Sequence, residues 1–90
     1  MSKKLQEPEI EYLKDSELYS TSDLPLATII SLSFPIEAMN RSNPQRVSFI
    51  FRRDGALDEL IEAYWRGELK VEPKQLFNQL RVLKSRIYQS

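Results

Sequence analysis

Residues 46–53 of this chain alternate between two kinds of side chain. They run Arg46-Val47-Ser48-Phe49-Ile50-Phe51-Arg52-Arg53. Successive side chains of a β-strand point to opposite sides, so Val47, Phe49 and Phe51 would share one face. The pattern predicts a strand whose aromatic face is buried.

A second strand is predicted directly before this one. Residues 36–40 suit an extended conformation, and residues 41–45 are rich in turn formers. The two strands would therefore form a β-hairpin. Residues 18–21 can add a further short strand.

Three helices complete the expected fold, over about residues 24–32, 56–66 and 73–88. Asp23 suits the start of the first, Gly67 the end of the second and Pro73 the opening of the third. The third helix has the most regular apolar repeat: Leu76, Leu80, Leu83 and Ile87. We expect Leu80 and Leu83 at the centre of the core. The chain is thus predicted to be a small α+β domain, a β-hairpin packed with three helices in the order helix-strand-strand-helix-helix.

Ninety residues suffice for one modest core. We expect residues 1–16 to be a flexible N-terminal arm and residues 17–90 a single globular domain. The longest apolar stretch is too short and polar to span a bilayer, and the first residues lack the core of a signal peptide. We therefore expect no membrane partner. Because the chain has no Cys and so no disulfide, we expect a cytoplasmic location.

The composition argues against most catalytic chemistry. The chain has no His, no Cys and only 2 Gly, whereas most nucleophilic, redox and transition-metal sites need such residues. Glu9 and Glu11 lie in a polar segment, and the acidic residues near Glu62 fall on the solvent side of a helix. We therefore expect no catalytic residue, no metal and no cofactor, as in a non-enzymatic accessory protein.

The 13 basic and 13 acidic residues cancel in number but are segregated along the chain. Residues 24–53 carry a net charge of +3, residues 54–72 carry −4, and residues 73–90 carry +4 with no acid. Cations beside aromatic rings suit a phosphate backbone and exposed bases. We expect nucleic acid to bind through the hairpin and last helix, at Arg46, Arg52, Arg53, Lys74, Arg81, Lys84 and Tyr88. A plainer interpretation is that Phe77 and Tyr88 widen the apolar seam while the cations keep the helix soluble.

A protein–protein adaptor, or a homodimeric interaction module, is the alternative function. Trp65 falls at the margin of its helix's apolar stripe, where we expect it to pack on a neighbouring element. If exposed, it would mark an interface, as would the apolar corner at Phe34 and Pro35.

Several segments resemble a family of small uncharacterised domains from bacteria, archaea and their viruses. They are residues 18–27, 47–51, 64–65, 67–71 and 80–84, within a resemblance that spans about residues 18–87. This chain has Phe34-Pro35 where the family tends to carry a Gly after its first helix. The resemblance implies the fold and a phage or mobile-element setting; no activity is established for the family.

Residues 46–88 also resemble the ribbon-helix-helix repressors in their order of strand, helix and helix. In those dimers an antiparallel ribbon enters the major groove. Two features depart from that pattern: Ile50 on the would-be reading face, and a preceding strand that would occupy the edge of the ribbon.

Overall fold

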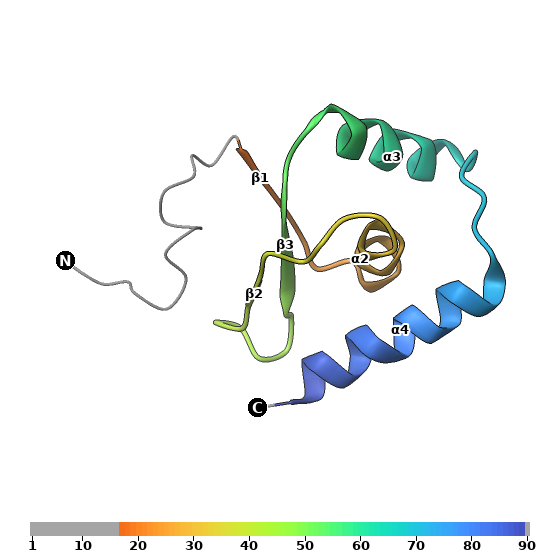
Figure 1. Ribbon diagram of the computed structural model, residues 1–90. Helices are drawn as coiled ribbons and strands as arrows, with labels where there is room; N and C mark the ends of the chain where they lie inside the picture. The colour runs from red at the N-terminus through yellow and green to blue at the C-terminus, as the bar shows by residue number, and fades with distance from the viewer. Residues whose placement is uncertain (1–16, 90) are drawn as a thin grey trace.

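The computed structural model describes residues 17–89. Its elements are β1 (Leu18–Thr21), α2 (Leu24–Ser31), β2 (Ala38–Asn40), β3 (Ser48–Arg52), α3 (Gly55–Arg66) and α4 (Pro73–Tyr88). In Figure 1 the sheet lies to one side of α2, and α3 and α4 lie on opposite sides of that helix. The α+β class and the order of the helices and hairpin strands are confirmed, and the short strand expected at residues 18–21 is β1.

β3 is the central strand of a three-stranded antiparallel sheet with the order β1-β3-β2. Tyr19 lies opposite Phe51, and Met39 lies opposite Phe49. Phe49 and Phe51 are fully buried, which confirms the predicted aromatic face. Because both edges of β3 are paired within the chain, this strand cannot supply the intermolecular ribbon of a ribbon-helix-helix dimer.

Both strands of the hairpin are shorter than predicted. Arg46 donates its backbone N–H to the Asn43 carbonyl at 2.9 Å, so it belongs to the turn rather than to β3. At the other strand, Glu37 makes one backbone bond to Ile50 at 2.8 Å, but regular pairing begins only at Ala38.

The three helices begin and end close to where their cap residues predict. The Asp23 side chain accepts a hydrogen bond from the Leu26 backbone N–H at 3.0 Å, and Asp54 accepts one from Leu57 at 2.8 Å. Gly67 follows α3 with φ 73°, the left-handed conformation in which an L side chain would be strained.

The core gathers around α2, which is too short to be stable without tertiary contacts. The fully buried apolar residues are Leu26, Ala27 and Ile30 of α2, Phe49 and Phe51 of β3, Leu57 of α3 and Leu83 of α4. Thr28 is also buried, and its hydroxyl donates to the Leu24 carbonyl at 2.8 Å, which satisfies it within the helix. Each of the two long helices therefore contributes a single fully buried leucine.

The expectation for α4 is confirmed at Leu83 and wrong at Leu80. Leu83 has no exposed surface, whereas Leu80 is only half-buried. Leu80 lines a hollow between α2 and α4 instead of reaching the centre of the core. The helix is therefore rotated slightly from the orientation we expected.

We predict that Leu83→Ala lowers the free energy of unfolding by about 2–5 kcal/mol, because it removes buried methyl groups and leaves a cavity. Leu80→Ala should cost clearly less, since Leu80 itself is only half-buried and already borders an open hollow. The control Asn78→Ala, on the exposed side of α4, should change stability by less than about 0.5 kcal/mol. Urea denaturation of the three variants measures this order, and a larger loss for Leu80→Ala would contradict it.

Candidate nucleic-acid interface

Helix α4 is fixed by its ends and by one apolar side. At its start the Glu72 side chain accepts a hydrogen bond from the Gln75 backbone N–H at 2.7 Å, and Pro73 occupies the first turn. Gln79 donates to the Ser31 hydroxyl of α2 at 3.0 Å. With Leu83 buried against α2, the opposite side of α4 faces solvent.

Five exposed residues lie along one flank of α4 at helical spacing. They are Lys74, Phe77, Arg81, Lys84 and Tyr88, here called the basic–aromatic stripe. Their spacing of three and four residues places them on one side of the helix, over about 21 Å from Lys74 to Tyr88. Phe77 is 56% exposed and Tyr88 is 81% exposed. The rings therefore do not simply widen the apolar seam, as the plainer interpretation supposed.

The cations of the stripe are not neutralised within the part of the chain that the structure describes. Residues 73–90 contain no acid, and across residues 17–89 no ion pair involves Lys74, Arg81 or Lys84. Arg81 bonds only to the neutral side chain of Asn78, one turn away. These charges remain available to an anionic ligand.

The three predicted cations of the hairpin do not join the stripe as one face. Arg46 and Arg53 lie at opposite ends of β3, about 23 Å apart along an extended chain. Arg53 contacts the Asp58 carboxylate at 3.1 Å and lies over the Tyr19 ring, and Arg52 lies 3.8 Å from Glu37. Two of these cations thus face carboxylates at the end of the sheet that leads into α3.

Arg46 is placed differently. Its Nε donates to the Ser22 hydroxyl at 2.9 Å, a neutral partner beside the start of α2. It belongs to the β2–β3 loop, which approaches the C-terminal end of α4. Arg46 is therefore the hairpin cation most compatible with binding together with the stripe.

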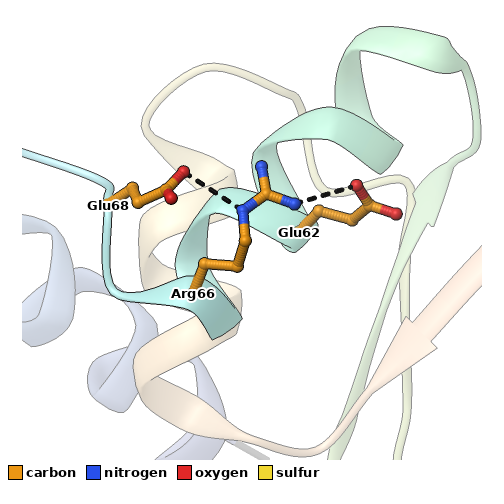
Figure 2. Close-up of polar contacts among 3 residues, drawn as sticks. All are labelled: Glu62, Arg66 and Glu68. Atoms are coloured by element: carbon orange, nitrogen blue, oxygen red, sulfur yellow. Dashed lines mark hydrogen bonds and ion pairs between the residues drawn. The ribbon is translucent and has the colours of Figure 1, made fainter.

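The surface of α3 has the opposite character. Arg66 is held between two carboxylates, 3.3 Å from Glu62 and 3.1 Å from Glu68 (Figure 2). These exposed pairs add little stability, but they neutralise the one arginine of α3. The charge segregation of the sequence thus persists in the fold, with an unpaired basic helix and an acidic, internally paired one.

Each aromatic ring of the stripe borders a hollow. Phe77 lines one of about 230 Å³ between α2 and α4, whose other walls are Pro25, Thr28, Ile29, Leu76 and Leu80. Tyr88 lines another of about 310 Å³ against the β2–β3 loop, with Arg41, Pro44, Val47, Ile87 and Gln89.

Trp65 and Phe34 differ in exposure. The expectation that Trp65 packs on a neighbouring element is wrong, because 63% of the residue is exposed; its ring makes an edge-to-face contact with the adjacent Tyr64 ring. Phe34 is half-buried against the core, and it lines a hollow of about 200 Å³ that includes Pro35 and Arg52. Trp65 is therefore the more accessible of the two predicted protein-binding residues.

Partial burial raises the pKa of the Tyr64 phenol above its usual value of 10.0, and the nearby Asp23 carboxylate adds to the rise. Tyr64 is thus neutral at physiological pH. Within residues 17–89, no three acidic side chains come close enough together to hold a metal ion. Nor does any helix in that range have the length and apolarity needed to cross a membrane.

Arg41 is a residue of this region that sequence reasoning missed. Its guanidinium donates to the carbonyls of Arg86 at 2.6 Å, Ile87 at 3.0 Å and Gln89 at 3.2 Å. These are last-turn carbonyls that lack partners within a helix. Arg41 therefore caps the C-terminus of α4 and ties the hairpin to it. Since the partners are 45 or more positions apart in sequence, no local pattern indicates the contact.

We predict that Arg41→Ala lowers the free energy of unfolding by about 1 kcal/mol, because exposed carbonyls of α4 lose a charged donor. Arg41→Lys should recover only part of the loss, since an ammonium cannot reproduce the planar fork. Hydrogen exchange by NMR should become faster in the last turn of α4 and stay unchanged in α3. Unchanged exchange throughout α4 would contradict the role of Arg41 as a cap.

Comparison with known proteins identifies the family but supplies no function. Residues 16–89 match the model of a family described as a domain of unknown function, DUF5659. No match was found among curated proteins or among solved structures. The resemblance over about residues 18–87 to a family of small uncharacterised domains is thereby confirmed. Since the match covers most of its length, the chain belongs to the DUF5659 family of domains of unknown function.

Proposed function

We propose that this domain is a non-enzymatic cytoplasmic accessory protein that binds nucleic acid through the basic–aromatic stripe of α4. The observation that carries the proposal is the absence of any carboxylate paired with Lys74, Arg81 or Lys84 within residues 17–89. Binding of phosphates by such cations releases counterions and supplies most of the sequence-independent affinity. Arg46, whose side chain bonds only to the neutral Ser22 hydroxyl within residues 17–89, is the hairpin cation that could add to this binding.

The cations near α3 contribute less in this proposal. Arg53 and Arg66 already face carboxylates at 3.1–3.3 Å, so a phosphate would have to compete with an existing partner. The position of the charges along the fold, and not their number, therefore determines which surface binds. A neutral total charge is compatible with a local basic surface of this kind.

We predict that replacing Arg81 and Lys84 by Ala weakens binding and makes it less dependent on salt. Removing two phosphate contacts should reduce the slope of log affinity against log salt by about 1.4 on single strands or about 1.8 on duplex DNA. Fluorescence anisotropy with labelled single- and double-stranded DNA and RNA measures both quantities.

The matched control is Arg66→Ala with Lys70→Ala, which removes the same formal charge from α3 and its following linker. This control should leave affinity and slope nearly unchanged, because Arg66 is already paired with two carboxylates. Equal losses from both double variants would mean that only net charge matters. No binding by the unmodified domain to any of the four probes at low salt would refute the proposed function.

The exposure of Trp65 supports a second function, that of a protein–protein adaptor or homodimer. Solvent-exposed tryptophans are costly to hydrate and are frequent anchors of interfaces. At 63% exposure, Trp65 contributes little to the core and offers its ring to a partner. Trp65 lies on α3, whereas the stripe lies on α4.

If Trp65 forms a homodimer, its fluorescence emission should be that of a water-exposed ring at low protein concentration and shift to the blue as concentration rises. Trp65→Ala should keep the domain monomeric in light scattering and change its stability by less than about 1 kcal/mol. Association that persists in Trp65→Ala would exclude this surface as the dimer interface.

A further inference from the structure

The stripe repeats one combination of features twice along α4. Phe77 and Tyr88 each border a hollow, and the two rings are about 16 Å apart along the helix axis. Arg81 and Lys84 lie between them on the same flank. Along this flank, a ring beside a hollow is therefore followed by two cations and then by a second ring beside a hollow.

The hollow beside Phe77 suits the face of a flat apolar ring. Its volume of about 230 Å³ exceeds the roughly 150 Å³ of an apolar cavity that holds benzene. Its one polar residue, Thr28, is fully buried and donates its hydroxyl hydrogen to the Leu24 carbonyl, so this side chain offers no free donor to a ligand in the hollow. Such a site would hold a base by its face without reading its edge.

The hollow beside Tyr88 combines an exposed ring with the β2–β3 loop. Tyr88 is 81% exposed, and Val47 and Ile87 form apolar walls next to it. The Arg41 guanidinium also lines this hollow while it caps α4. A second base can therefore rest against Tyr88 with positive charge close by.

We propose that the occupant of this surface is single-stranded nucleic acid, with unstacked bases against Phe77 and Tyr88 and the intervening phosphates on Arg81 and Lys84. This inference rests on the proposed function and narrows it to one class of ligand. Bases within a duplex are stacked on one another and cannot offer their faces to a protein ring. A duplex could use only the cations, and the exposure of both rings would then have no role.

A protein partner fits the surface less well. An amphipathic helix that docks in a groove needs apolar contacts on successive turns. Along the stripe the two rings are instead separated by Arg81 and Lys84. The order of ring, two cations and ring suits a strand that offers both base faces and phosphates, and residues 73–90 contain no acid that would oppose the phosphates.

The experiment compares four ligands of about 12 nucleotides: oligothymidylate, oligouridylate, an abasic strand and a duplex. The variants are Phe77→Ala, Phe77→Leu and Tyr88→Ala, each checked for folding by urea denaturation. Phe77→Leu keeps an apolar side chain in the hollow and removes only the ring, so it stays informative if Phe77→Ala is unstable. Val82→Ala is the matched control, since Val82 is 49% exposed on the other flank of α4.

Binding to oligothymidylate should exceed binding to the duplex, and each ring substitution should weaken it roughly five- to 150-fold. The same substitutions should have no effect on the abasic strand, and Val82→Ala should have none on any ligand. If oligouridylate binds more tightly than oligothymidylate, the surface is assigned to RNA; if oligothymidylate binds more tightly, it is assigned to DNA. Either result supports the inference.

Equal affinity for duplex and single strand, with no effect of the ring substitutions, would overturn the inference while leaving the proposed function intact. In that case Arg81→Ala with Lys84→Ala would still weaken binding. Absence of binding to all four ligands would refute both. An acidic amphipathic peptide that binds more tightly than any of the strands, and loses affinity in Phe77→Leu, would assign the surface to a protein partner.

Discussion

The packing of α2 is the contact on which the rest of the domain depends. This helix has only eight residues, and three of its apolar side chains are fully buried. It is enclosed by the sheet on one side and by α3 and α4 on two others (Figure 1). Three of the seven residues in the buried cluster come from α2. Each long helix contributes one fully buried leucine, Leu57 or Leu83. The outer sides of α3 and α4 therefore face solvent.

The exposed surfaces of the two long helices, α3 and α4, differ in their charges. The one arginine of α3, Arg66, is paired with Glu62 of the same helix and with Glu68 just after it. On α4 no acid is present, and two of the cations, Arg81 and Lys84, lie between exposed rings. Exposed aromatic rings and like charges on one flank do not stabilise a helix, because the rings lose burial and the cations repel one another. A ligand that covers the rings and neutralises the cations removes both costs.

The sequence predicts most of the local structure because caps, turns and apolar periods are local. Asp23 and Gly67 lie at helix ends as expected, and the alternation around Phe49 identifies the buried face of the sheet. Four members of the stripe, Lys74, Arg81, Lys84 and Tyr88, were also among the binding residues expected from the sequence. The exposure of side chains at the margin of a helix could not be predicted, because it depends on which other elements pack beside that helix. Trp65 lies at the margin of its stripe, and its exposure depends on whether another element reaches that margin.

The same limit applies to the charges. Counting residues places Arg52 and Arg53 in a basic segment, but only the fold shows that each faces a carboxylate from elsewhere in the chain, Glu37 and Asp58. The role of Arg41 could not be predicted either, because its partners are backbone carbonyls of α4, which are distant in sequence and are not marked by any residue type. A helix C-terminus carries a partial negative charge, which would repel a phosphate near Lys84 and Tyr88. The Arg41 guanidinium lies on those carbonyls and opposes that charge. The contact that holds the hairpin to α4 thus also makes the end of the stripe electrostatically suitable for an anionic strand.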